Sequence, residues 1–233
     1  MANEPLLIDF NGFLDKYYID VGGALIAGFV AISVAYGVFT WRPTLRSIFG
    51  GSRRTGPSPS KSRAILRGLV FDVVLQKPVK DCSAGRWAVH FSIFWGFVGL
   101  AVATTLDAII NPLAAPLPLA SPVRVIGNVS GILFLVGVSL SIGRRAVVPD
   151  VRRNSSLADA LFLFLLFATG ITGFATEYFS DLNFVLPDLV SFAVHVVFVT
   201  ALLVTAPFTK FVHSIGRPIL LLLKRLAGTT ESS

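Results

Sequence analysis

The sequence predicts an all-α polytopic membrane protein, a bundle of five transmembrane helices. Of its 233 residues, 54% are hydrophobic and only 14% are charged, which is the composition of membrane proteins rather than of soluble ones. The mean hydropathy of +0.74 agrees with this. Apolar runs of about 20 residues, the length that crosses a bilayer, occur at 21–41, 87–110, 123–143, 157–179 and 185–212. We expect residues 1–233 to form a single membrane domain.

The first span is expected to remain in the protein, because no positively charged n-region precedes it and no small-residue cleavage site follows it. After it comes a cytoplasmic loop, residues 42–86, which opens with a Gly-, Ser-, Pro- and Arg-rich stretch. Later in this loop, residues 63–80 carry apolar side chains at helical spacing with basic residues nearby. That pattern predicts a helix that lies on the inner membrane surface or under a partner protein.

The later spans are separated by short connections. A proline-broken loop at 111–122 follows the second span, because proline cannot continue a helix. The fourth span is expected to begin at Ser156, since Asp159 stands three residues further on and completes a capping-box pattern. After the fifth span, residues 216–227 are expected to form a short interfacial helix.

The charges are divided unevenly between the two sides that these spans create. One side, which holds the N-terminus and the 111–122 loop, has two basic and eight acidic residues, and the other has 18 basic and five acidic residues. Because basic loops stay in the cytoplasm, we expect an outer N-terminus and a cytoplasmic C-terminus in a prokaryotic plasma membrane. The net charge of +7 therefore reflects topology and contact with lipid, and no nucleic-acid partner is expected.

The three histidines all fall within or at the ends of apolar spans, where histidine usually has a function. His195 and His213 are 18 residues apart, so they project from one face of the fifth span, about 27 Å apart. Because the second and fifth spans run in opposite directions, His90 and His213 are expected at one depth on the cytoplasmic side. Cys82 and Met1 are the only residues of their types. The pattern therefore predicts one haem b with His90 and His213 as axial ligands of the iron.

Other residues near this depth have two interpretations. Arg86 and Lys210 are placed to neutralise the haem propionates, or they are ordinary basic residues at cytoplasmic helix ends. Four glycines would permit the close approach of a porphyrin, although helix packing is the simpler explanation for each of them. They are Gly96, Gly99, Gly170 and Gly173.

The outer half is expected to contain the site of proton and quinone chemistry. The position that would face His195 is Leu100, ten residues after His90, and leucine cannot bind iron. His195 therefore binds a second haem with a weak or missing sixth ligand, contacts quinone, or only packs. The nearby candidates for quinone or proton chemistry are Asp107, Glu177 and Tyr178, for which the alternative is a simple solvated helix end.

Two stretches resemble a known family. Gly-Arg-Trp-Ala-Val-His-Phe-Ser-Ile-Phe-Trp-Gly-Phe at 85–97, and His195 with Pro-Phe-Thr-Lys-Phe-Val-His at 207–213, are similar to five-helix membrane cytochromes b. These are the gamma subunit of respiratory nitrate reductase and the related membrane subunit of heterodisulfide reductase. The likeness covers about residues 20–218. It implies haem b between the second and fifth helices, with His90 and His213 binding the haem nearer the cytoplasm.

The resemblance also bears on the outer site and on function. His195 matches the ligand of the outer haem in nitrate reductase, but the partner position there is a histidine and here is Leu100. The family implies electron exchange between membrane quinone and a cytoplasmic iron–sulfur subunit. We therefore expect an electron-transfer subunit of a quinone-linked oxidoreductase rather than an enzyme on its own. Its docking surface would comprise the 42–86 loop, the 144–153 loop and the C-terminal segment.

Two alternatives to this function stay open at the level of sequence. The first is a haem-free membrane anchor or a small proton-coupled transporter, in which the histidines relay protons. The second is a cytochrome that serves a different soluble enzyme, such as a hydrogenase or a formate enzyme.

Overall fold

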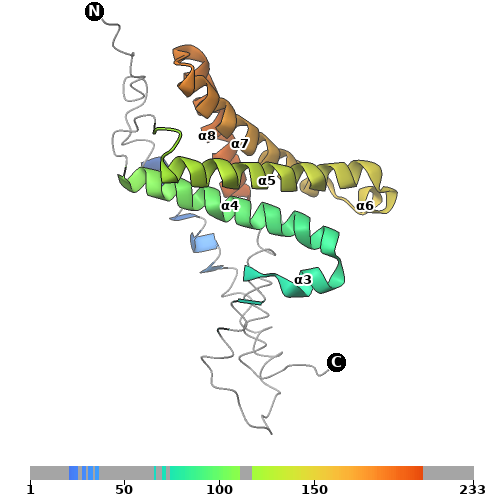
Figure 1. The fold of residues 1–233 in the computed structure, drawn as a ribbon. Coiled ribbons are helices and arrows are strands. Elements are labelled where there is room, and N and C mark those ends of the chain that lie inside the picture. The colour runs from blue at the N-terminus through green and yellow to red at the C-terminus, as the bar shows by residue number, and fades with distance from the viewer. Residues whose placement is uncertain are drawn as a thin grey trace, which may run out of the picture. The chain divides into compact units, whose positions relative to one another are not determined.

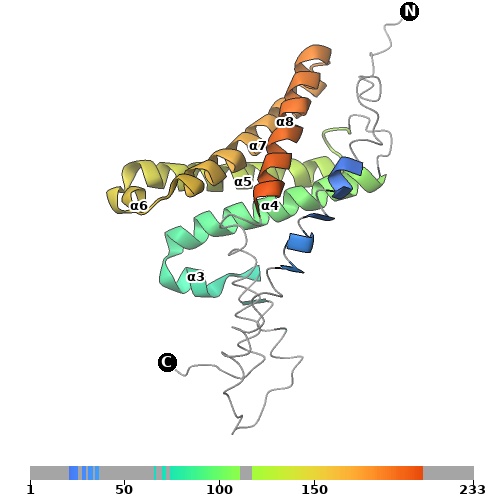
Figure 2. The ribbon, with the colours of Figure 1, turned by 180° about the vertical axis from the view of Figure 1, so that it is seen from behind.

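The computed structural model describes residues 21–25, 28–29, 31–33, 35–36, 66, 70–71, 74–110 and 117–206 (Figures 1 and 2). Throughout these ranges the regular structure is helical, which confirms the predicted all-α class. The helices are α3 (Lys77–Cys82), α4 (Ala84–Ile110), α5 (Pro122–Val147), α6 (Pro149–Arg153), α7 (Leu157–Asp181) and α8 (Val185–Thr205).

Four of these helices, α4, α5, α7 and α8, are long and apolar enough to cross a membrane. They coincide with the second to fifth predicted spans, with ends that differ by a few residues where both are described. The described residues between 21 and 36 are helical as well, as the first predicted span requires. Residues 37–65 and the chain after Ala206, including Lys210, His213 and the predicted helix 216–227, lie outside the described residues.

The chain divides into two compact units, one formed by residues 1–27 and 88–204 and the other by residues 28–87 and 205–233. Within the first unit, α4 and α5 run side by side, and both views show this arrangement (Figures 1 and 2). The short helix α6 connects α5 to α7, and a tight turn at residues 182–184 connects α7 to α8. The second unit contains α3.

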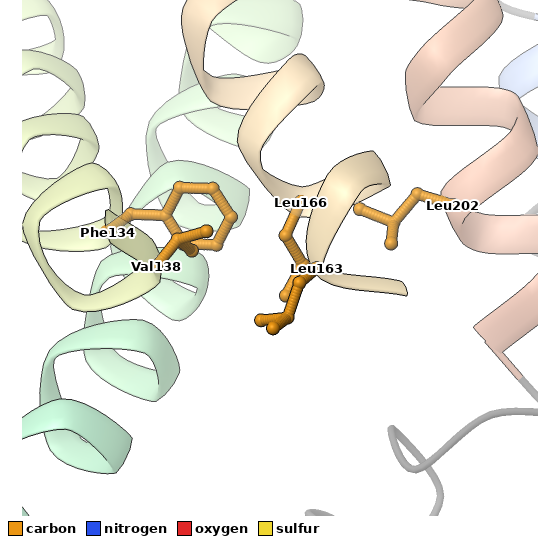
Figure 3. Packing of buried hydrophobic residues seen from close by; sticks show 5 residues of the cluster. All are labelled: Phe134, Val138, Leu163, Leu166 and Leu202. Atoms are coloured by element: carbon orange, nitrogen blue, oxygen red, sulfur yellow. The ribbon is translucent and has the colours of Figure 1, made fainter. Parts of the chain in front are cut away.

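Apolar side chains from α5, α7 and α8 form the core of the first unit (Figure 3). Phe134 and Val138 of α5 are 1% and 0% exposed, so α5 is the central helix of this core. The cluster comprises Phe134, Val138, Leu163, Leu166 and Leu202. From α4, the Phe97 ring approaches the Phe134 ring at 6.4 Å between centroids. Most other large apolar side chains of these helices face outward, as expected for a protein that lipid surrounds.

Glycines bring the backbones of neighbouring helices together. A β-carbon on Gly96 of α4 would lie 2.6 Å from the backbone nitrogen of Phe134, and one on Gly99 would lie 2.0 Å from the Ser130 hydroxyl. On α7, a β-carbon on Gly170 would meet Leu135 at 2.5 Å. These three glycines therefore serve helix packing, which is the simpler of the two roles considered for them.

The start of α7 matches its predicted capping box. The Asp159 backbone N–H donates to the Ser156 hydroxyl at 3.2 Å, and the Ser156 backbone N–H donates to the Asp159 carboxylate at 3.1 Å. Two of the amide groups that a helix start leaves unpaired are satisfied in this way. The capping pattern therefore locates the beginning of this span correctly.

The segment before α4 differs from its prediction. The helix expected over residues 63–80 is not continuous, because the backbone at Gln76 has a left-handed φ of 48° and α3 begins at Lys77. Pro78 lies in the first turn of α3, where a missing N–H costs nothing, whereas it would interrupt a longer helix. The Trp87 indole N–H donates to the Leu75 carbonyl at 2.9 Å across this break.

We predict that Gly96→Ala lowers the free energy of unfolding by about 1–3 kcal/mol, because the added methyl group would meet the immobile backbone at Phe134. The measurement is denaturant unfolding of the purified chain in detergent. Gly143→Ala on α5 is the matched control, since no atom of the described residues lies within 4 Å of its added β-carbon. Equal stabilities for the two variants would contradict the close packing of α4 on α5.

Candidate functional site

His195 of α8 is half-buried and faces α7. Its Nδ1 atom lies 3.0 Å from the hydroxyl oxygen of Thr172. The Thr172 hydroxyl itself donates to the Ala168 carbonyl at 2.7 Å, so its oxygen accepts a hydrogen bond from the imidazole. We therefore assign the proton of the neutral ring to Nδ1, and Nε2 remains the acceptor atom. This is the arrangement in which a histidine binds a metal or accepts a proton through Nε2.

Gly173 makes room for this imidazole. A β-carbon at residue 173 would lie 3.1 Å from Cε1 of His195, which is closer than ordinary van der Waals contact. Of the four glycines considered from the sequence, Gly173 is the one whose added β-carbon would meet a histidine ring. It positions His195 against α7.

Leu100, the residue expected to face His195 from the second span, is packed into the core. Its methyl group lies 3.6 Å from the position that a β-carbon on Gly131 would take, and Leu100 contacts the buried cluster around Phe134. This side chain is directed at α5.

A polar cluster joins the start of α5 to the end of α7. The Arg124 side chain, only 12% exposed, donates to the Glu177 carboxylate at 2.6 Å and also to Asp181. The third guanidinium nitrogen, Nη1, donates to the Leu117 carbonyl at 2.8 Å. The Asn128 amide donates to Glu177 at 2.9 Å. Glu177 is therefore an ion-paired group that pins two helices, rather than the solvated helix end considered from the sequence.

Glu177 and Thr172, the residue that contacts His195, lie on different faces of α7. Five residues separate Thr172 from Glu177, which turns the two side chains about 140° apart on α7. Tyr178 is 61% exposed, and its ring contacts that of Phe179. Asp107 is half-buried in the last turn of α4. His195 is thus held by Thr172 and Gly173, whereas Glu177 belongs to the Arg124 cluster.

At the other end of α4, His90 is half-buried within the second turn of the helix. Aromatic residues follow it directly, and the Trp95 ring packs against Phe94 at 5.5 Å and Phe91 at 6.2 Å between centroids. Such a surface suits a flat apolar cofactor, so the donor type and its surroundings fit a haem ligand. The Arg86 side chain, one turn earlier, is exposed.

Three polar residues of these helices were not singled out from the sequence as candidates. Arg124 and Thr172 hold Glu177 and His195, respectively. Asp188 in the first turn of α8 is fully buried, and neither of its carboxylate oxygens has a partner at hydrogen-bond geometry among the described residues. A usable signal existed for each of them, because each is a polar residue inside a predicted apolar span.

Comparison with known proteins identifies related chains. The family model that matches residues 66–221 is HdrE, one of the subunits of dihydromethanophenazine:CoB–CoM heterodisulfide reductase. The HdrE proteins of Methanosarcina acetivorans and Methanosarcina barkeri are each 26% identical to this chain. The first alignment covers 70% of this chain and 67% of the relative, and the second covers 75% and 72%. No solved structure matches the chain.

We predict that Arg124→Met lowers the free energy of unfolding by about 1–3 kcal/mol, because Glu177 and Asp181 would keep partly buried charges without a counter-ion. The double variant Arg124→Met/Glu177→Gln should recover part of this loss, since it removes one of the two stranded charges. Arg144→Met, at an exposed position on the same helix, is the control. If the Arg124 and Arg144 variants unfold alike in a denaturant titration, the cluster does not pin the helices.

Proposed function

The chain belongs to the HdrE family, whose members are membrane subunits of the heterodisulfide reductase redox complex, and from this premise we propose that it is a haem b electron carrier. It takes electrons from a reduced, lipid-soluble two-electron carrier and passes them to a cytoplasmic iron–sulfur partner. The observation that supports this proposal most directly is the extent of the family match. It includes every helix from α3 to α8 and all three histidines.

The lipid-soluble carrier would be a dihydrophenazine or a quinol. The names of the relatives specify dihydromethanophenazine as electron donor and the CoB–CoM heterodisulfide as acceptor. A dihydrophenazine and a quinol both carry two removable hydrogens on a flat ring. The Nε2 atom of His195 is a hydrogen-bond acceptor for one of them, because Thr172 holds the Nδ1 proton. His195 is thus proposed to contact the carrier.

His90 and His213 are proposed to hold the haem. This pairing is supported by the sequence, in which the two residues fall at one depth on antiparallel spans, and by the half-buried setting of His90 beside aromatic residues. A haem bound there supplies one-electron transfer, which couples a two-electron carrier to iron–sulfur clusters. Arg86 and Lys210 would counter the negative charge of its propionates.

Three histidines provide one bis-histidine pair and one remaining imidazole. Leu100 packs into the core and provides no ligand opposite His195. We therefore assign His195 to the carrier rather than to a second haem. The docking side for the iron–sulfur partner would be the basic, cytoplasmic side, formed by the 42–86 and 144–153 loops and the C-terminal segment.

We predict that His90→Ala and His213→Ala each abolish a low-spin, six-coordinate haem b signal. The only methionine and the only cysteine of the chain, Met1 and Cys82, fall outside the predicted membrane spans and are not expected to replace the lost ligand. The measurement is the reduced-minus-oxidised visible spectrum of the purified chain, together with its haem content. His195→Ala is the control and should retain the signal. Full haem content with an unchanged spectrum in His90→Ala would refute the assignment.

The charge distribution predicts which side of the membrane each loop faces. In a Cys82→Ser background, a membrane-impermeant thiol reagent should label Ser58→Cys only from the cytoplasmic side and Ala115→Cys only from outside. Since 18 basic residues are assigned to one side and two to the other, the positive-inside bias is strong. Labelling of both positions from the same side would overturn the five-span topology.

A further inference from the structure

A stripe of hydroxyl groups runs along one face of α7, which is otherwise mostly apolar. Successive members stand three or four residues apart, so they share a face of the helix. They are Thr169, Thr172, Thr176 and Ser180. The spacing carries the stripe from the middle of α7 to its last turn, next to α8. Hydroxyl groups can both donate and accept hydrogen bonds, as proton transfer along a chain of groups requires.

A matching polar stripe lies on α8. Asp188, Ser191 and His195 are three and four residues apart, and together with Leu202 they form the inward face of this helix. Asp188 and Ser191 are buried, and the Ser191 hydroxyl donates to the Asp188 carbonyl at 2.9 Å. His195 and Asp188 are separated by two turns, about 10 Å along the axis.

The two stripes meet at both ends. Deeper in the bundle, His195 Nδ1 lies 3.0 Å from the Thr172 hydroxyl oxygen. Near the α7–α8 turn, the Ser180 side chain approaches the Asp188 carboxyl. Between these points the Thr176 hydroxyl donates to the Thr172 carbonyl at 3.0 Å. We call this line of polar groups, from His195 through Thr172, Thr176 and Ser180 to Asp188, the α7–α8 seam.

Asp188 is the feature of the seam that packing does not explain. It is 0% exposed, and within the described part of the chain both carboxylate oxygens lack a partner at hydrogen-bond geometry. A buried carboxyl in this condition is costly and rare unless it has a function. Its place in the first turn of α8 is favourable for a negative charge because of the helix dipole. The helix dipole of α8 therefore partly stabilises the negative charge of the Asp188 carboxylate. Its oxygen lone pairs remain available to accept a proton.

We propose that the α7–α8 seam conducts protons from the carrier to the α7–α8 turn, with Asp188 as the last acceptor. This inference rests on the proposed function. Oxidation of one reduced carrier removes two electrons and two protons. The electrons leave through the haem to the iron–sulfur partner. A proton enters at Nε2 of His195, and the ring then releases its Nδ1 proton toward the Thr172 hydroxyl. Transfer of the remaining ring proton from Nε2 back to Nδ1 through water restores Nε2 as the acceptor for the second proton.

Beyond Thr172, the proton passes the hydroxyls of Thr176 and Ser180, with water bridging the intervals, and binds Asp188. When Asp188 releases this proton, its side chain becomes a carboxylate again and can accept the next proton. The basic side lies at the opposite ends of these helices in the expected topology, so the protons would leave on the outer side. Electrons and protons from one carrier thus leave in opposite directions.

The test uses the full chain with its haem in lipid nanodiscs, with reduced phenazine as the donor and haem reduction as the readout. Asp188→Asn, which keeps the shape but cannot take a proton, should slow this reduction roughly 100-fold, the lower end of the effect of a positioned proton acceptor. Thr176→Val should slow it as well. Asp188→Glu should retain most of the rate. Reduction by dithionite, which needs no proton path, should be unchanged in all three variants.

Thr105→Val is the matched control for Thr176→Val, because the Thr105 hydroxyl also donates to the carbonyl four residues earlier, at 2.7 Å, but lies on α4 outside the seam. A second readout does not depend on turnover. The redox-difference infrared spectrum of the wild-type chain should contain a carboxyl carbonyl band that disappears in Asp188→Asn.

Each outcome decides a separate point. A wild-type rate in Asp188→Asn overturns the path. A second result would also overturn the path: haem reduction is slow in Asp188→Asn but not in Thr176→Val, and Asp188→Asn loses no infrared carboxyl band. In that case Asp188 only stabilises the α7–α8 turn. If Asp188→Asn does not fold, Thr176→Val and the infrared band of the Asp188→Glu variant decide the question. A wild-type chain that dithionite reduces but reduced phenazine does not would instead reject the proposed function, and the path with it.

Discussion

The polar side chains of this protein lie in helices built to cross an apolar medium, so each must find its partner within the chain. This constraint explains the contacts of the first unit. Arg124 is matched by Glu177 and Asp181 of α7. His195 is matched by Thr172. Among the described residues, the Thr169 hydroxyl and both carboxylate oxygens of Asp188 depart from this rule. Of these two side chains, Asp188 is the one that can hold an additional proton as a carboxylic acid, and we assign the proton to it.

In an apolar medium the helices gain nothing from burying apolar side chains against each other, because lipid is as apolar as a leucine side chain. Their association therefore depends on how closely their surfaces fit. Gly96 and Gly99 let α4 approach α5, and Gly170 lets α7 approach the same helix. With α5 at the centre, α7 and α8 are placed so that Gly173 and Thr172 meet His195. Small residues thus determine where the His195 imidazole lies, although they carry no chemistry themselves.

Much of the fold could be predicted from the sequence, because long apolar runs and a capping box are local signals. The second to fifth spans and the start of α7 at Ser156 are of this kind. The break at Gln76 was missed, since periodic apolar residues on both sides obscured the effect of Pro78 on the helix. The Arg124 cluster was missed for another reason. It joins residues on two helices, and helix rotation about the axis is set by packing that no single span reveals.

For the candidate site, too, the sequence predicted single residues but not the contacts between helices. His195 was singled out by its place in an apolar run, but its partner Thr172 and the cradle at Gly173 follow only from how α7 and α8 face each other. The pairing of His90 with His213 stays a prediction from topology, because His213 lies outside the described residues. The family match agrees with the predicted membrane subunit of heterodisulfide reductase. The names of the relatives contain dihydromethanophenazine, and for that reason the carrier we propose includes dihydrophenazines as well as quinols.

The central claim is that this chain alone holds one haem between two histidines. The most direct measurement is the haem-to-protein ratio of the purified chain by pyridine haemochrome, combined with near-infrared magnetic circular dichroism of the oxidised protein. We expect one haem b per chain, with the charge-transfer band of bis-histidine ligation. A chain purified intact and folded without haem, or with a haem whose band shows another ligand pair, would contradict it.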